Sequence, residues 1–359
     1  MRTRPSKRTF MIRRIVVLGV LVLVLVLLVS AVRASVGGDD AISSPDSTAV
    51  APNSEVSSPS TSPIETPPTE TTGPRIPSAA DPARVLLVGD SEAQGLGPFL
   101  QSVLDVDKLT TLTVDGRNST GLVRDDFFDW PAKLNELVPS VDPDIVVAFF
   151  GGNDGQSFQN MPTKRVDSPE WRAEYGKRVG AVMDFLGADG RTLIWIGVPN
   201  AAEADFSARL TVLNAVINEQ VASHPDVIFI DSWRLFSGID GGYAPLVIDP
   251  LSGTYIAVQA ERDKFHLNTP GSKILAAAVA DAIAEDLVRR GATIAADPTS
   301  TTIDINSPGT YTIVEGDTLT GIAAKTGTTI GAIVSVNGWA DENEVIQVGQ
   351  GIKLPAKSG

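Results

Sequence analysis

The stretch VLLVGDSEAQ, residues 85–94, predicts a short buried strand that ends in a glycine, a carboxylate and a hydroxyl. Gly89 and Asp90 are turn formers and Ser91 is a common helix N-cap residue, so the segment fits an ordinary turn into a helix. Alternatively, Ser91 is a nucleophile at the carboxyl end of a parallel strand, where open α/β sheets bind their ligands. The second interpretation requires the rest of the chain to supply a base, an acid and an anion site.

Short apolar runs alternate with amphipathic stretches from residue 84 to about residue 296. Five of the runs, each bounded by turn residues, predict strands: RVLLV, TTLTV, DIVVAFF, TLIWIGV and VIFID. Longer segments predict helices over residues 168–187, 208–223 and 271–290. Strands that alternate with helices imply a mostly parallel sheet covered by helices on both faces. The predicted class is therefore α/β, with a three-layer, flavodoxin-like or Rossmann-like domain over residues 83–296.

Two further segments carry the polar residue types that acyl transfer needs. The strand DIVVAFF is followed by GGND at residues 151–154, and RDKFHLNTPG places Asp263 three residues before His266. In a helical-type turn this offset puts both side chains on one side, so that Asp263 can hold the Nδ1 proton while Nε2 accepts the proton of Ser91. The side-chain amide of Asn153 is a neutral donor suited to a developing oxyanion.

Four short blocks in this order resemble the SGNH (GDSL-type) hydrolases, a family of esterases and lipases. The blocks are GDS at 89–91, a glycine-containing loop, GGND at 151–154 and DKFH at 263–266. Each block is common by itself, but together and in order they are specific, and the resemblance covers roughly residues 84–290. It implies a triad in which Ser91 is the nucleophile, His266 the general base and Asp263 the residue that orients the base.

The same resemblance implies an oxyanion hole made of the Ser91 amide, a glycine amide and the Asn153 side chain. In TVDGRNSTGL, residues 113–122, the expected glycine is Gly121, because the family's loop tends to end in a small residue followed by glycine; Gly116 is the alternative. The chain departs from the longer GDSL form at Glu92, where leucine would stand. Glu92 is either a charge favoured by the helix dipole or a residue that restricts the acyl pocket.

The composition excludes several classes of function. The chain has 29 basic and 43 acidic residues and a formal net charge of −14, which disfavours binding to nucleic acid. It contains no cysteine, which rules out thiol catalysis, disulfides and cysteine-ligated metals. Its two histidines leave two candidates for the base, and His224 in ASHPDV is typical of a surface loop. The carboxylates and histidines show no metal-ligand spacing, so we expect neither a metal nor a cofactor.

The N-terminal segment, residues 1–34, carries signals of export. A basic start precedes an uncharged run, rich in Val and Leu, from Ile15 to Val32, which reaches the lower range for a membrane-spanning helix. We favour an uncleaved single-pass transmembrane helix; the alternative is a signal-peptide core with a poor cleavage site. Either way, the rest of the chain is expected to be extracytoplasmic. Residues 35–82 are rich in Ser, Thr and Pro and predict a disordered linker.

A second module follows a linker at residues 297–308. Residues 309–356 predict a βααβ unit, with Asp317 or Thr318 capping the first helix and Thr328 or Thr329 the second. The segment resembles a LysM domain across its full length, including YTIVEGDTL, VNGW and VGQGIKLP. The resemblance implies a groove for N-acetylglucosamine-containing glycans such as peptidoglycan, contacted by Gly316, Asp317, Thr318, Asn337 and Gly338.

Together these features predict an exported serine esterase that a LysM module targets to the cell wall. The predicted substrates are wall-associated esters, with O-acetyl groups on peptidoglycan or another wall glycan as the first candidates. Water would open the acyl-enzyme, and no cofactor is needed. Two alternatives remain open. One is a cell-wall O-acyltransferase in which a sugar hydroxyl replaces water, and the other is a catalytically inactive peptidoglycan-binding scaffold.

Overall fold

The computed structural model describes residues 76–106, 108–294 and 304–357. The larger domain is built on a sheet of five parallel strands in the order β2-β1-β3-β4-β5. The strands are β1 (Ala83–Gly89), β2 (Thr110–Gly116), β3 (Ile145–Phe149), β4 (Thr192–Ile196) and β5 (Ile228–Ile230). This is the flavodoxin-like strand order. The predicted α/β class with a parallel sheet is confirmed.

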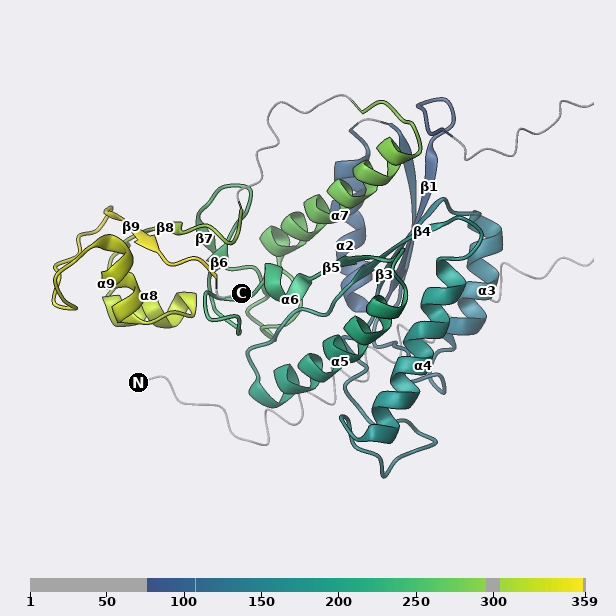
Figure 1. Cartoon of the computed structure of the whole chain (residues 1–359), viewed down its shortest axis with the longest axis horizontal. Coiled ribbons are helices and arrows are strands. Elements are labelled where there is room, and N and C mark those ends of the chain that lie inside the picture. Colours follow the sequence, from purple (N-terminus) through teal and green to yellow (C-terminus); the bar gives the residue numbers. More distant parts are fainter. Residues whose placement is uncertain (1–75, 107, 295–303, 358–359) are drawn as a thin grey trace, which may run out of the picture. The chain divides into compact units, whose positions relative to one another are not determined.

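Helices cover both faces of this sheet (Figure 1). α2 (Ser91–Leu104) and α7 (Thr269–Arg289) pack against each other and share one apolar core with Val85 and Leu87 of β1. α3 (Trp130–Val141), α4 (Pro169–Leu186) and α5 (Ala204–Ser223) share a second core with Leu86 and Val88. The side chains of β1 therefore alternate between two cores, which explains why its apolar run is continuous.

The ends of the helices follow capping residues in the sequence. Ser168 caps α4 and Gly187 ends it, as expected for a helix over residues 168–187. α5 begins four residues before the expected segment 208–223, because the side chain of Glu203 accepts hydrogen bonds from two backbone amides of its first turn. α3 was not among the expected helices. Asp129 caps it and a proline lies in its first turn, which is a favourable start.

Short elements connect β5 to α7. They are the one-turn helix α6 (Ser232–Leu235) and an antiparallel ribbon of β6 (Val247–Ile248) and β7 (Tyr255–Ile256). The chain then forms the loop that carries Asp263 and His266, and Asn268 caps α7 by accepting a hydrogen bond from the amide of Gly271. The expected helix over residues 271–290 is thus observed, beginning two residues earlier.

The C-terminal domain has the predicted strand-helix-helix-strand order. Its elements are β8 (Gly309–Thr312), α8 (Leu319–Thr326), α9 (Ile330–Asn337) and β9 (Gly351–Leu354). The two strands pair antiparallel, and the helices pack on them around a small apolar core that includes Ile322 and Ile333. Of the expected caps, Thr318 and Thr329 serve, each accepting a hydrogen bond from the amide three residues on.

Within the described residues, no single helix is both long and apolar enough to cross a bilayer. α8 and α9 meet the criterion of length and composition only when counted as a pair, and the pair is bent by 103°. The predicted transmembrane or signal segment at residues 1–34 and most of the predicted linker at 35–82 lie outside the described residues.

Candidate active site

Ser91, His266 and Asp263 form one hydrogen-bonded chain. Ser91 Oγ lies 3.0 Å from His266 Nε2, and His266 Nδ1 lies 2.9 Å from Asp263 Oδ2. An imidazole protonated at Nδ1 donates to Asp263 and leaves the lone pair of Nε2 facing the hydroxyl. The structure therefore brings together the three predicted triad residues in the arrangement that base-assisted attack by a serine requires.

The position of Ser91 follows from the close approach of β1 and β3. Gly89, the last residue of β1, has a φ of 151°, and a Cβ there would lie 2.0 Å from the carbonyl oxygen of Phe149. The amide of Asp90 donates to that same carbonyl at 3.2 Å. Ser91 therefore leaves the sheet between β1 and β3, where the strand order reverses and open α/β sheets bind ligands.

Asp90 joins the GDS turn to the GGND loop. It is fully buried, and its carboxylate accepts hydrogen bonds from the amides of Glu92 at 3.0 Å, Gly152 at 2.8 Å and Gly151 at 3.2 Å. Burial raises the pKa of Asp90 to about 7, against the effect of these amides and with a contribution from the charge of Asp154. The sequence indicates only a turn residue at Asp90, because Gly151 and Gly152, which it joins to the GDS turn, lie 61 and 62 residues away.

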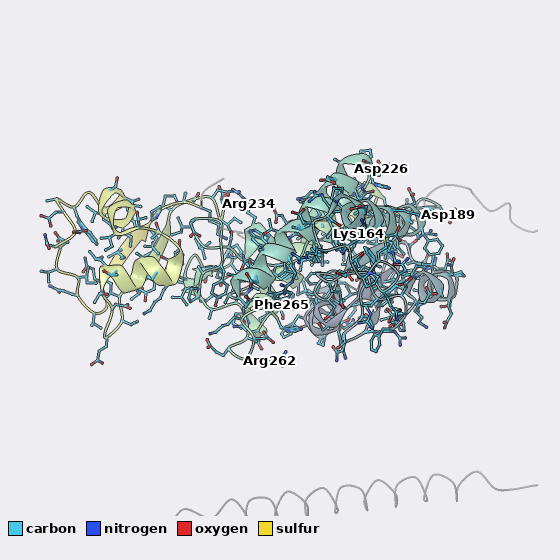
Figure 2. The ribbon with its side chains drawn as sticks, turned by 90° about the horizontal axis from the view of Figure 1, so that it is seen from below. Lys164, Asp189, Asp226, Arg234, Arg262 and Phe265 are labelled. Carbon is cyan, nitrogen blue, oxygen red and sulfur yellow. The ribbon has the colours of Figure 1, made fainter. Side chains whose placement is uncertain are left out.

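The loop before α7 is held by Asp263 itself. Asp263 Oδ1 accepts hydrogen bonds from the amides of Phe265 and His266, both at 3.1 Å, and Lys264, between Asp263 and Phe265, has a φ of 53°. Burial acts to raise the pKa of Asp263, but hydrogen bonds from Arg262, the Phe265 amide and His266 outweigh it and lower the pKa to about 2. Asp263 is therefore ionised at neutral pH and suited to orient the imidazole. Figure 2 labels Arg262 and Phe265 of this loop, with Arg262 below Phe265.

The pocket that holds Ser91 and His266, the serine pocket, has a volume of about 520 Å³. Asn153 lines it, as the predicted role in an oxyanion hole requires, and Asn153 Nδ2 donates to the carbonyl of Thr120 at 2.9 Å. Asn118 and Ser119 also line it, and sequence reasoning missed both. Nothing in the local sequence distinguishes them from other polar loop residues.

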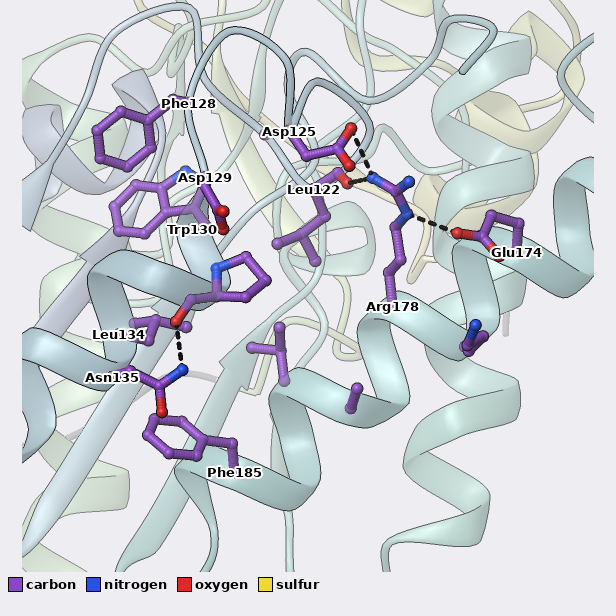
Figure 3. A pocket seen from close by; sticks show the side chains of 15 residues that line it. Leu122, Asp125, Phe128, Asp129, Trp130, Leu134, Asn135, Glu174, Arg178 and Phe185 are labelled. Atoms are coloured by element: carbon purple, nitrogen blue, oxygen red, sulfur yellow. Dashed lines mark hydrogen bonds and ion pairs between the residues drawn. The ribbon is translucent and has the colours of Figure 1, made fainter. Parts of the chain in front are cut away.

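The two candidate glycines lie elsewhere. Gly121 lines a neighbouring pocket of about 490 Å³ between α3 and α4, shown in Figure 3, and not the serine pocket. Gly116 ends β2 and pairs in register with Gly89 at the end of β1. The structure thus brings neither glycine into the lining of the serine pocket. That the Gly121 amide contributes to an oxyanion hole stays a prediction.

Asp154 holds in place the loop that follows β2 and contains Gly121. Its Oδ1 accepts a hydrogen bond from the amide of Val123 at 2.9 Å, and its Oδ2 accepts one from the hydroxyl of Tyr175 at 3.3 Å. A Cβ at Gly121 would lie 2.1 Å from Asp154 Oδ1, so the loop can close over this carboxylate only with glycine at this position. The aspartate of GGND is therefore a support for the loop next to the catalytic residues.

Arg178 on α4 also holds this loop in place (Figure 3). Its Nη1 donates to the carbonyl of Leu122 at 2.7 Å, and the guanidinium pairs with Asp125 at 3.1 Å and Glu174 at 2.9 Å. Such a partly buried guanidinium with several acceptors holds its partners in one geometry. Two residues that lie far from this loop in the sequence, Asp154 and Arg178, thus hold it beside the serine pocket.

Replacing Asp154 with asparagine is expected to remove a pH dependence of stability. Burial raises the pKa of Asp154 to about 6, so the folded chain keeps a proton that the unfolded chain releases at about pH 4. Asp154 by itself should therefore lower the free energy of unfolding by on the order of 2–3 kcal/mol as the pH rises from about 4 to about 6, in addition to any fall due to Asp90. Asparagine keeps an acceptor for the Val123 amide but does not titrate, so the variant should lose this fall.

Urea denaturation at several pH values between about 4 and 8 measures the effect. The matched control is Asp226→Asn, because Asp226 is exposed and its side chain makes no hydrogen bond or ion pair within the described residues. The control should keep the wild-type slope of stability against pH. Identical slopes for Asp154→Asn and the wild type would contradict the prediction.

His224, the other histidine, lies apart from the triad residues. Its Nδ1 is 2.7 Å from the carbonyl of Gln220 and its Nε2 is 3.2 Å from Asp184, at the end of α5. It lines a different pocket from Ser91. In the part of the chain that the structure describes, no group of three or more His, Cys, Asp or Glu side chains is placed to hold a metal ion.

In the C-terminal domain, three of the predicted glycan contacts, Asp317, Thr318 and Asn337, have internal partners. The carboxylate of Asp317 accepts hydrogen bonds from Tyr311, the Val314 amide and Lys325. The side chain of Asn337 bonds to both backbone groups of Lys353 and so fixes α9 to β9. Gly316 and Gly338 occupy turns with positive φ, and Thr318 caps α8. The glycan-contact roles of these five residues stay predictions.

Two family models match parts of the chain, and solved structures align with its larger domain. Residues 84–282 match the family described as "Protein of unknown function (DUF459)", and residues 311–355 match the LysM domain. No curated protein matches the chain. Among solved structures, a GDSL-like lipase from Bacteroides thetaiotaomicron VPI-5482 aligns at 16% identity and a TM-score of 0.43, over 57% of this chain and 89% of its own.

Two further solved structures align over similar lengths. An acetyl xylan esterase, AlAXEase, aligns at 18% identity and a TM-score of 0.43, over 56% of this chain and 99% of its own. A putative acylhydrolase from Bacteroides fragilis NCTC 9343 aligns at 13% identity and a TM-score of 0.44, over 60% of this chain and 92% of its own. The DUF459 match covers more than half of the chain, which therefore belongs to this family, known as SGNH-like, and carries a LysM domain after it.

Proposed function

We propose that the chain is a serine esterase that removes acyl groups from carbohydrate. The observation that carries the proposal is the chain of contacts from Ser91 Oγ to His266 Nε2 at 3.0 Å and from His266 Nδ1 to Asp263 at 2.9 Å. Ser91 and His266 line a pocket that Asn153 also lines. A hydroxyl, a base and a neutral donor at one pocket are the parts that acyl transfer through a covalent intermediate requires.

The proposed reaction begins when Ser91 Oγ attacks the ester carbonyl carbon and gives its proton to His266 Nε2. The side-chain amide of Asn153 and the amide of Ser91 stabilise the oxyanion, together with a glycine amide of the loop after β2. The imidazolium then donates its proton to the leaving alcohol, which leaves an acyl group on Ser91. Water then attacks the acyl carbon and gives a proton to His266 Nε2. The bond from this carbon to Ser91 Oγ breaks, the acid leaves, and the imidazolium returns the proton to Ser91 Oγ.

We propose O-acetyl groups of a cell-wall glycan, peptidoglycan in particular, as the substrate. LysM domains bind N-acetylglucosamine-containing glycans, and the LysM domain here is part of the same chain as the esterase domain. A binding domain on the same chain raises the effective concentration of its glycan around the catalytic residues. An extracytoplasmic location, with the N-terminal segment as a membrane anchor or signal, belongs to this proposal.

The test is hydrolysis of p-nitrophenyl acetate by the purified full chain, compared with Ser91→Ala. Turnover by the wild type alone, together with labelling of Ser91 by a fluorophosphonate, supports the esterase. Acetate release from O-acetylated peptidoglycan, with and without an acceptor glycan, then separates hydrolysis from acyl transfer. A folded wild-type protein that neither hydrolyses short esters nor reacts with the probe would contradict the proposal and favour a binding scaffold.

A further inference from the structure

Glu92 is a buried carboxylate beside the triad that the mechanism above does not use. Its side chain is 4% exposed, and it lines the serine pocket. Its Oε1 lies 3.8 Å from His266 Nε2, the nitrogen that also faces Ser91 Oγ. This oxygen is buried and has no hydrogen-bond partner among the described residues. A buried polar atom without a partner is costly, so its position next to the base calls for an explanation.

Charged groups face Glu92 from two sides. Asp90 precedes it at the start of α2, and Arg262, Asp263 and His266 face it from the loop before α7. Burial, the charge of Asp90 and the charge of Asp263 raise the pKa of Glu92 well above its usual range, while the amide of Leu267 and the charge of Arg262 oppose the rise. The carboxyl group is therefore neutral in mild acid and becomes ionised only at higher pH.

We propose that Glu92 is a positioning residue that acts through His266: its ionised carboxylate stabilises the imidazolium formed when Ser91 loses its proton. The inference rests on the proposed esterase function, because it concerns the same imidazole. In this step the proton moves from Ser91 Oγ to His266 Nε2, and Glu92 neither gains nor loses one. Asp263 stabilises the cation from the Nδ1 side and Glu92 from the Nε2 side.

The interaction contributes to rate because the charge on His266 develops during the reaction. A stabilisation that is stronger in the transition state than in the free enzyme raises kcat/KM. The distance is 3.8 Å and the Glu92 side chain is only 4% exposed, so its carboxylate acts on the cation more strongly than it would in bulk solvent. Neutral Glu92 cannot provide this effect, so we expect activity to increase when Glu92 ionises, beyond the increase due to the base alone.

The test is the pH dependence of kcat/KM for p-nitrophenyl acetate, corrected with Ser91→Ala, in the wild type and in Glu92→Gln. Glutamine resembles the neutral carboxyl group and keeps an oxygen for the amide of Leu267. Measured from about pH 5 to about pH 9, the ratio of wild type to variant should increase with pH, to on the order of tenfold where Glu92 is ionised. The matched control is Glu170→Gln, an exposed first-turn glutamate of α4, which should give a constant ratio.

A ratio for Glu92→Gln that stays constant across the pH range would overturn the inference, because a merely structural role changes activity equally at every pH. Glu92→Leu is the second variant and should show the same rising ratio, since it also lacks the charge. If turnover depends on Ser91 but the ratio of wild type to Glu92→Gln is the same at every pH, only the role of Glu92 is refuted and the esterase proposal stands. Absence of any turnover that depends on Ser91 refutes the esterase proposal, and the inference with it.

Discussion

Replacing His266 with alanine is expected to lower kcat/KM for an acetyl ester by at least about 10³-fold, because it removes the base from Ser91. His266 Nε2 is 3.0 Å from the serine hydroxyl, and no other imidazole in the described residues lies near it. The effect should appear almost entirely in kcat, because the imidazole contributes more to the transition state than to the bound substrate. Steady-state kinetics with p-nitrophenyl acetate measures the change.

His224→Ala provides a closely matched control. Like His266, His224 lies near a carboxylate, here that of Asp184 at 3.2 Å, but its ring lies at the end of α5 and lines another pocket. This variant should retain wild-type kinetics, and thermal unfolding of both variants checks that the comparison is between folded proteins. A fall of less than tenfold for His266→Ala, or equal losses for the two variants, would show that His266 is not the base.

The sequence was sufficient to predict which residues the sheet brings together, and the reason is topological. In a parallel sheet the residues after β1 and β3 necessarily lie at one edge, so GDS and GGND predict neighbours without any knowledge of side-chain contacts. Asp263 and His266 were predictable as a pair from their spacing together with the occurrence of GGND in the same chain. The contact of His266 with Ser91 spans 175 residues and was predictable only through the order of the blocks.

The glycine of the oxyanion hole was harder to predict because the loop after β2 has no regular structure to fix it. Its path depends on Asp154 and Arg178, which contact it from other elements, and on a positive φ at Ser119. None of these features leaves a periodic pattern in residues 113–122. The glycan contacts of the LysM domain show the same difficulty, since the sequence does not reveal that Asn337 binds the backbone of β9.

α3 was missed for a related reason. Its segment WPAKLNELVPSV contains two prolines, which count against a helix when they are considered without their positions. Pro131 lies in the first turn, where its ring is tolerated, and Pro139 lies in the last turn. Burial of Trp130 and Leu134 in the core on this face of the sheet then stabilises the helix.

Replacing Gly89 with alanine is expected to destabilise the larger domain by more than about 4 kcal/mol, or to prevent folding. The added Cβ would lie 2.0 Å from the carbonyl oxygen of Phe149 and 2.9 Å from the Cβ of Ala93. Neither neighbour can move away cheaply, because the first is backbone of the adjacent central strand and the second is buried in α2. The φ of 151° at this position adds backbone strain for any residue with a side chain.

Gly95→Ala is the control that separates this collision from the loss of a glycine as such. Gly95 lies on the exposed side of α2, a Cβ there would meet no atom within 4 Å, and alanine is the better helix former. The control should be stabilised by about 0.5–1 kcal/mol. Urea denaturation of both variants gives the comparison. If Gly89→Ala folds with stability near that of the wild type, β1 and β3 do not approach as closely as the structure has them, and the position of Ser91 between them would have to be reconsidered.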